Sequence, residues 1–210
     1  MFQKITRNRL ELFLVKYRSV DKILDVGSGG SSYHRFFPNR ITVDIDPGRK
    51  PSIVADVHDL PFADNEFSIV LCTEVLEHTK DPRLAVGEMM RVLKKGGILI
   101  LTTRFVYPLH DTPHDYWRFT KYGLQELFKQ WTILEIQSET QSFSALAVLI
   151  QRLVFQTNLY FNKIIKGLLL VSAYIINKVN FLIVNEYGSI KKDNLEEDIM
   201  STGYYIVVKK

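Results

Sequence analysis

A glycine turn with an acidic residue just before it is the clearest chemical signal in this sequence of 210 residues. Asp25 precedes the run Gly27, Ser28 and Gly29 by two positions. Glycine lets the backbone bend sharply and lets a ligand approach where a Cβ atom would stand in the way. A dinucleotide site typically shows Gly-x-Gly-x-x-Gly, but Ser32 occupies the third glycine position here. A carboxylate beside the turn repels a pyrophosphate and suits an amine-bearing ligand, which favours S-adenosylmethionine over a nicotinamide cofactor.

Two further aspartates follow later predicted strands. Asp44 ends the predicted strand 40–44, where a carboxylate can accept hydrogen bonds from ribose hydroxyls. Asp56 follows the next strand and can accept from an adenine amino group, while the Val57 amide reads a ring nitrogen. An isolated aspartate after a strand has a structural alternative, in which it caps a helix or accepts from turn amides. Their arrangement along the chain favours a nucleoside-containing cofactor.

Residues 104–120 combine histidine, acidic, basic and aromatic side chains in a stretch broken by prolines. This stretch follows a predicted strand, so we expect it over the ligand end of the sheet, where α/β enzymes build their substrate loops. His110 is predicted to act as a general base or to orient the acceptor, and Asp115 and Arg118 to hold the loop or the substrate. The alternative is an Asp115–Arg118 ion pair that only fixes the loop. The other predicted substrate contacts are Arg104, Tyr107, His114 and Tyr116.

The elements that must position these residues alternate between strand and helix, which predicts an α/β, doubly wound, Rossmann-like sheet with helices on both faces. The predicted strands lie at 22–26, 40–44, 52–55, 67–72, 98–103, 131–137 and 203–208, and the predicted helices at 31–37, 82–93 and 121–130. Pro82 suits the first turn of a helix, with Asp81 as its cap. The glycines at 96–97 are expected to stop that helix before the next strand. A further amphipathic helix is predicted before the first strand.

Four segments resemble class I S-adenosylmethionine-dependent methyltransferases of the broad type 11 group, which includes quinone-biosynthesis enzymes. They are 25–29, 43–47, 56–62 and 74–78, in the order and spacing of that family, and the resemblance covers residues 20–140. It implies a mostly parallel seven-stranded sheet whose last strand, 203–208, is antiparallel and inserted beside the sixth. The whole of 1–210 would be one methyltransferase domain, with a helical insertion at 142–190. Ser31 stands where the family usually has its third glycine.

The same resemblance implies where the cofactor, S-adenosyl-L-methionine, is bound. The implied contacts are Asp25 near the methionine amino group, Gly27, Ser28 and Gly29 along the turn, Asp44 at the ribose with Ile45 beside it, Asp56 and Val57 at the adenine, and the Cys72 backbone at the methionine portion. A reactive role for the Cys72 thiol is not expected, because free cysteine usually behaves as a small buried apolar residue.

Methyl transfer to a hydroxyl needs a base for the acceptor's proton, and histidine titrates in the useful range. His110 is the predicted base. His78, which the resemblance places near the mouth of the site, is a second candidate, and its alternative is a structural histidine bonded to Glu74 or Asp81. His110 and His114 have the spacing of a helical metal pair, but Pro113 between them argues against a helix, so no metal site is predicted.

Residues 142–184 contain no acidic side chain and four basic ones, at positions 152, 163, 166 and 178. Helices are predicted at 144–155 and 159–176, and the longest uncharged apolar run, 167–176, is shorter than the roughly 20 residues of a membrane span. Two hypotheses stay open. The segment packs on its own domain or forms a homodimer face, or it is an interfacial helix pair resting on a membrane near anionic head groups.

The net charge of +4 comes without a Lys/Arg block or an aromatic-basic stripe, so no nucleic-acid partner is predicted. The single cysteine favours a reducing cytoplasm, at the inner face of the membrane if the apolar segment binds lipid. The predicted activity is methyl transfer, O-directed, to a small-molecule or lipid-linked glycan acceptor, since loops similar to 108–120 occur in methyltransferases associated with surface-glycan biosynthesis. The alternatives are a quinone-ring methyltransferase, a non-catalytic cofactor-binding scaffold subunit and a nicotinamide oxidoreductase.

Overall fold

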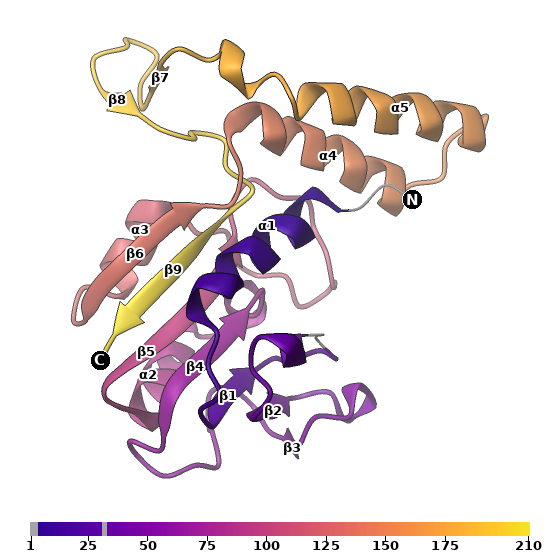
Figure 1. The fold of residues 1–210 in the computed structure, drawn as a ribbon. Helices are drawn as coiled ribbons and strands as arrows, with labels where there is room; N and C mark the ends of the chain where they lie inside the picture. Colours follow the sequence, from indigo (N-terminus) through magenta and orange to yellow (C-terminus); the bar gives the residue numbers. More distant parts are fainter. Residues whose placement is uncertain (1–3, 31–32) are drawn as a thin grey trace. The chain divides into compact units, whose positions relative to one another are not determined.

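A seven-stranded sheet forms the framework of the chain in the computed structural model, which describes residues 4–30 and 33–210. The strand order is β3-β2-β1-β4-β5-β9-β6, and Figure 1 shows β9, in yellow, between β5 and β6. The strands are β1 (Ile23–Val26), β2 (Arg40–Asp44), β3 (Ile53–Val54), β4 (Phe67–Thr73), β5 (Leu93–Arg104), β6 (Thr132–Ser138) and β9 (Gly203–Lys209). The pairs from β3 to β5 are parallel. The predicted seven-stranded, mostly parallel α/β sheet is confirmed.

The last strand runs antiparallel to β5. Gly96 donates to the Lys210 carbonyl and Lys210 to the Gly97 carbonyl at one end, and Phe105 donates to the Thr202 carbonyl at the other. Partners that rise along β5 while they fall along β9 define an antiparallel pair. This confirms the inserted last strand that the resemblance implied.

Helices occupy the connections between the strands. The α-helices are α1 (Ile5–Leu14), α2 (Pro82–Val92), α3 (Lys121–Leu127), α4 (Ser142–Gln156) and α5 (Asn162–Ile176), and the 3-10 turns are η1 (Val15–Tyr17), η2 (Tyr33–Arg35), η3 (Pro47–Arg49), η4 (Leu76–His78) and η5 (Asn180–Leu182). The predicted cap of α2 is confirmed, because the Asp81 carboxylate accepts from the Arg83 and Leu84 amides and Pro82 stands in the first turn.

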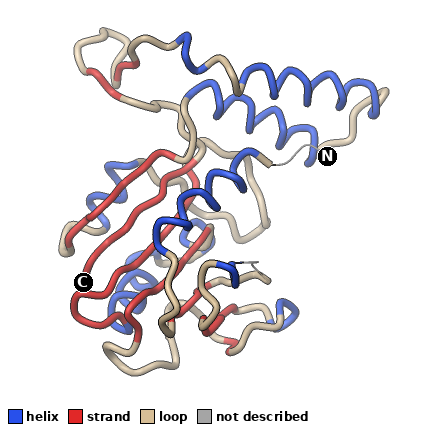
Figure 2. Tube along the Cα trace, in the orientation of Figure 1, coloured by secondary structure: helices blue, strands red, loops and turns tan. Residues whose placement is uncertain are grey.

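The predicted helix at 31–37 is wrong. Only the single turn η2 forms in its described part, and Figure 2 shows loop around it between β1 and β2. Pro38 accounts for the end of the turn, because the residue before a proline is disfavoured in the helical conformation. Ser31 and Ser32, where glycines were expected from related patterns, lie outside the described residues.

The glycines at 96–97 do not separate a helix from a strand as predicted. Strand β5 begins at Leu93, directly after α2, and continues through both of them. A Cβ atom on Gly97 would lie 2.9 Å from the Ser68 carbonyl oxygen, and Gly96 has a φ of +78°. The pair of glycines therefore permits a close approach of β5 to β4 rather than a stop.

The chain divides into two compact units. One holds residues 13–104, 109–137 and 204–210, and the other holds 105–108, 138–203 and the described part of 1–12. In the second unit, α4 and α5 run antiparallel (Figure 1), and the Asn180 side chain accepts from the Phe143 and Ser144 amides at the start of α4. A short hairpin of β7 (Glu186–Tyr187) and β8 (Leu195–Glu196), which was not predicted, lies at the end of the insertion.

Candidate functional site

The turn after β1 requires glycine. Gly27, Gly29 and Gly30 have φ angles of +64°, +51° and +73°, which L side chains rarely adopt. A Cβ atom on Gly27 would lie 2.2 Å from Val75 Cγ2. Val75 comes from the connection after β4, so the glycine turn and that connection are packed against each other at the carboxyl edge of the sheet, where open α/β sheets bind ligands.

Asp44 supports this turn from the end of β2. Its Oδ2 accepts from the Gly29 amide at 2.9 Å, and its Oδ1 accepts from the Asp46 amide at 3.0 Å. A carboxylate oxygen has more than one acceptor site, so both oxygens can still accept from a ligand hydroxyl. Asp44 therefore accepts from turn amides, as in the structural alternative. It can still accept from ribose hydroxyls, as predicted.

Asp25 makes an ion pair that the sequence did not reveal. Its carboxylate is fully buried, with Oδ2 3.0 Å from Arg40 Nη1 on the neighbouring strand β2. A buried carboxylate needs such a partner because burial penalises its charge. Part of the negative charge expected to face a ligand amine is therefore balanced within the sheet.

The remaining predicted cofactor residues lie along the same edge. Asp56 Oδ1 is 2.6 Å from His58 Nδ1 and also accepts from the His58 amide. Burial raises the pKa of Asp56, but these bonds outweigh it and the pKa is lowered overall, so the carboxylate stays charged. Ser28 is buried, Val57 half-buried and Ile45 exposed. Cys72 is fully buried in β4, where burial raises the pKa of its thiol, as expected of an unreactive cysteine.

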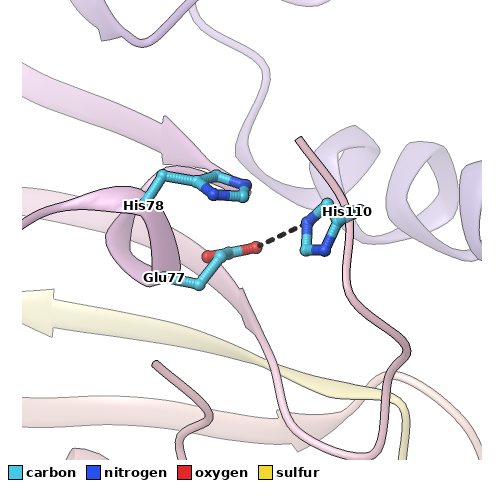
Figure 3. A group of neighbouring side chains, drawn as sticks. All are labelled: Glu77, His78 and His110. Carbon is cyan, nitrogen blue, oxygen red and sulfur yellow. Dashed lines mark ion pairs between the residues drawn. The ribbon is translucent and has the colours of Figure 1, made fainter. Parts of the chain in front are cut away.

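Three side chains with acid-base character meet after β4 and β5. Glu77 and His78 come from η4, and His110 comes from the loop that follows β5, as Figure 3 shows. His110 Nε2 lies 3.9 Å from Glu77 Oε1, and the two imidazole rings stand 4.6 Å apart between centroids. One nitrogen or oxygen atom from each of the three lies within 4.8 Å of the other two.

Each member of this cluster is held by a polar partner outside it. Thr103 Oγ1 donates to Glu77 Oε2 at 2.8 Å. His78 Nδ1 lies 2.7 Å from the His114 carbonyl oxygen, which can only accept, so Nδ1 carries a proton and Nε2 is the acceptor nitrogen of the neutral ring. The structural alternative for His78 expected a bond to Glu74 or Asp81. The partner found is the His114 carbonyl oxygen.

The loop after β5 is fixed to η4 and to itself. Asp115 receives both Arg118 terminal nitrogens at 2.6 and 2.7 Å and the His110 amide at 3.0 Å. The Arg118 bonds lower the pKa of Asp115 well below its usual range. The predicted ion pair therefore exists, and Asp115 also faces His110, with Oδ2 3.3 Å from Nδ1. The Tyr116 and Trp117 amides both donate to the Glu77 carbonyl, which ties the loop to the cluster.

Burial shifts the two central groups in opposite directions. It raises the pKa of Glu77 to about 7, against the lowering effect of Arg104, which also pairs with Glu74. It lowers the pKa of His110, against the raising effect of Asp115. A buried acid and a buried imidazole that are both shifted toward their neutral forms are typical of a functional site. Glu77 was not predicted as a site residue, although it lies in the segment 74–78 that carries the resemblance.

The side chains of His114 and Tyr107, two predicted substrate residues, make other contacts. His114 contributes its backbone carbonyl to His78, while its ring hydrogen bonds with the Tyr116 hydroxyl at 3.0 Å. Tyr107 belongs to the second unit, where the Arg152 guanidinium lies 5.0 Å from its ring centroid. No helix forms at 110–114, so the spacing of His110 and His114 has no metal-binding meaning.

Comparisons with known proteins point to one kind of domain. Residues 24–101 match a family model described as a methyltransferase domain. A ubiquinone biosynthesis O-methyltransferase of Pseudomonas fluorescens is 31% identical over 101 residues, which cover 39% of this chain and 44% of that protein. The chain spans less than half of the length of the first curated relatives that it matches, with shares of 42%, 49% and 44%.

Solved structures share the fold at low sequence identity. The cyclase SpnF has a TM-score of 0.61 at 17% identity, over 97% of this chain and 81% of that one. Phosphoethanolamine N-methyltransferase 2 of Haemonchus contortus, in complex with S-adenosyl-L-methionine, has a TM-score of 0.56 at 15% identity, over 96% of this chain and 52% of that one. These neighbours establish the architecture of the sheet.

Proposed function

We propose that the chain, whose residues 24–101 match a methyltransferase domain, is a class I S-adenosylmethionine-dependent methyltransferase that methylates a hydroxyl oxygen of a small-molecule or lipid-linked glycan acceptor. The observation that carries the proposal is the packing of Val75 on Gly27. It brings the glycine turn next to the short segment that holds Glu77 and His78. The proposed cofactor site and the proposed acid-base site thus share one edge of the sheet.

The glycine turn fits the methyl donor, because its left-handed backbone leaves no side chain on the ligand side. S-adenosylmethionine supplies, when bound, an electrophilic methyl carbon on a good leaving group. The residues proposed to hold it are Asp25, Gly27, Ser28, Gly29, Asp44, Ile45, Asp56, Val57 and the backbone of Cys72. Their main contribution is alignment, which supplies much of the rate in a displacement of this kind.

The cluster after β4 and β5 is proposed to receive the acceptor. His110 takes the hydroxyl proton at Nε2, with His78 beside it, and Asp115 holds the imidazole through Nδ1. The nearby residues proposed to orient the acceptor are Arg104, His114, Tyr116 and Arg118. A buried, positioned base of this kind contributes about 10²- to 10⁴-fold to rate.

A quinone-ring acceptor is the second candidate. It is favoured by the ubiquinone biosynthesis O-methyltransferases among the matching proteins. A non-catalytic scaffold explains the cofactor turn but gives no reason for a buried carboxyl group beside two half-buried imidazoles. A nicotinamide oxidoreductase is disfavoured by the carboxylate of Asp25 beside the glycine turn, which would repel a pyrophosphate, and by the match of residues 24–101 to a methyltransferase domain.

The experiment is transfer of tritium from methyl-labelled S-adenosylmethionine to a panel of acceptors. We expect label on a hydroxyl-bearing sugar or lipid-linked sugar, in an ether linkage that resists mild base. Label on a polyprenyl catechol instead would support the second candidate. Absence of transfer to either class, with tight cofactor binding retained, would support the scaffold alternative.

The helical insertion is proposed to meet a membrane surface or a second copy of the chain. On α5, Ile164, Leu168, Val171 and Ile175 are 68%, 66%, 50% and 56% exposed and recur at the spacing of one helix face. No helix in the described part of the chain combines the length and hydropathy needed to cross a bilayer. The exposed stripe, together with the basic side chains at 163, 166 and 178, suits an interfacial contact.

A further inference from the structure

We infer that Glu77, His78 and His110 bind one divalent transition-metal ion, through Glu77 Oε1 and the Nε2 atoms of the two histidines. The inference concerns binding and stands without any assumption about the acceptor. Only the part that the ion would have in the reaction rests on the proposed function.

The spacing of the three side chains is close to that of a metal site. One candidate ligand atom from each lies within 4.8 Å of the others, and His110 Nε2 is 3.9 Å from Glu77 Oε1. Ligand atoms around a tetrahedral zinc ion lie about 3.4 Å apart, given zinc-nitrogen bonds of about 2.1 Å. Rotation of the imidazoles about their side-chain bonds would close this difference, and Figure 3 shows both rings beside the Glu77 carboxylate.

The partners outside the cluster are those that metal ligands use. A histidine ligand usually directs its other ring nitrogen to a carboxylate or a carbonyl, which fixes the ring and its tautomer. His110 Nδ1 faces Asp115 Oδ2, and His78 Nδ1 faces the His114 carbonyl. Glu77 is held in the same way, because its Oε2 accepts from Thr103. Two of the three outer atoms are therefore hydrogen bonded, and the third, His110 Nδ1, lies 3.3 Å from a carboxylate oxygen.

Glu77 Oε1 gives an independent reason. The side chain is fully buried, and among the described residues this oxygen has no hydrogen-bond partner. A buried carboxylate oxygen without a partner is costly. A cation between Oε1 and the two imidazoles would remove this cost, and it would do so at the one oxygen that Thr103 leaves unbonded.

The donor set selects the class of metal. Two imidazoles and one carboxylate suit Zn²⁺ and Fe²⁺, whereas Mg²⁺ and Ca²⁺ prefer oxygen ligands. Three protein ligands leave a position open, as in catalytic zinc sites. An acceptor hydroxyl bound there would lose its proton to water more readily, because the ion lowers its pKa. His110 would then act as a ligand instead of the base.

The test uses the full chain, stripped of metal with a chelator and then titrated with Co²⁺ alone and with Zn²⁺ alone. We expect one Co²⁺ per chain, with visible absorption bands of low-symmetry coordination and competition by Zn²⁺. His78→Ala and His110→Ala should each abolish saturable binding. Thr103→Val, which removes only the hydroxyl bonded to Glu77, should weaken it by about 10- to 100-fold.

Two controls locate the site. His34→Ala removes an exposed imidazole outside the cluster and should leave Co²⁺ binding unchanged. His114→Ala removes a ring from the same loop while its carbonyl remains, and it should also leave Co²⁺ binding intact. Loss of binding in His114→Ala, or saturable binding that survives in either His78→Ala or His110→Ala, would overturn the assignment.

Failure to bind either ion in the wild-type chain would overturn the inference and leave the proposed function in place, with His110 as the base. Each variant is also titrated with S-adenosylmethionine by calorimetry. Retained cofactor binding shows that the domain is folded, so a loss of metal in that variant reports on the ligands. Metal binding without any binding of S-adenosylmethionine would contradict the proposed function and keep the metal site.

Discussion

Glu77 connects the two halves of the candidate site. Its side chain reaches the two histidines, while its backbone carbonyl accepts from the Tyr116 and Trp117 amides of the loop after β5. The loop that is proposed to receive the acceptor is thereby fixed by the backbone of the same residue that carries the buried carboxyl group.

Replacing His110 by alanine separates the chemistry from cofactor binding. We expect kcat on the acceptor identified by label transfer to fall by about 100-fold or more, because the base or metal ligand is lost. The affinity for S-adenosylmethionine should stay unchanged, since the glycine turn and Asp44 are untouched. Label-transfer kinetics and calorimetry measure the two quantities. Unchanged turnover would refute the role of His110, and His34→Ala should keep the wild-type rate.

Gly27 allows a matched comparison with Gly87. In Gly27→Ala the new Cβ meets Val75, and the left-handed backbone alone costs about 1–2 kcal/mol. In Gly87→Ala nothing lies within 4 Å of the new Cβ, and alanine in α2 should stabilise the chain by about 0.5–1 kcal/mol. Denaturant unfolding should therefore show opposite signs, and only Gly27→Ala should weaken cofactor binding. Equal effects would contradict the account of the turn.

At the scale of the elements, the exposed face of α5 separates the two hypotheses for the insertion. Leu168→Asp places a charge in the centre of the apolar stripe, whereas Asn162→Asp adds the same charge at the exposed first residue of the helix. If the stripe meets lipid, the wild type sediments with anionic vesicles, Leu168→Asp does not, and Asn162→Asp behaves as the wild type.

The same variants report on a homodimer. A concentration-dependent dimer that Leu168→Asp disrupts, without vesicle binding, would support the contact between two copies. If the wild type neither binds anionic vesicles nor associates in sedimentation velocity experiments, both hypotheses are contradicted and the stripe serves the chain's own packing.

The helices and strands that were predicted correctly are those with a strong local sequence pattern. The alternation of strand and helix predicted the α/β sheet, and the resemblance implied the observed place of β9 beside β6. The helix at 31–37 was wrong because apolar spacing says nothing of the left-handed glycines before it or of Pro38 after it. The two-residue strands β7 and β8 are too short to leave a periodic pattern.

The cluster could not be predicted in full for a different reason. Glu77 and His110 are far apart in the sequence and meet only because β4 and β5 are parallel neighbours whose connections leave at the same edge. Pro113 predicted that the stretch from His110 to His114 is not helical, and no helix forms there. The burial that shifts the pKa of Glu77 is a property of the folded chain alone.

At the scale of the whole molecule, the fold limits the reaction without fixing it. The cyclase SpnF shares the architecture with a TM-score of 0.61, so this sheet serves more than one chemistry. The function must therefore be argued from the site, where the glycine turn and the cluster around Glu77 lie at one edge. Binding of the methyl donor is the premise on which every other part of the account depends.

Calorimetric titration of the full chain with S-adenosylmethionine, and in parallel with NAD and NADP, tests that premise most directly. The account predicts saturable binding of one S-adenosylmethionine per chain, weakened in Gly27→Ala, and no saturable binding of either dinucleotide. Tight binding of NAD or NADP in the absence of any binding of S-adenosylmethionine would contradict it.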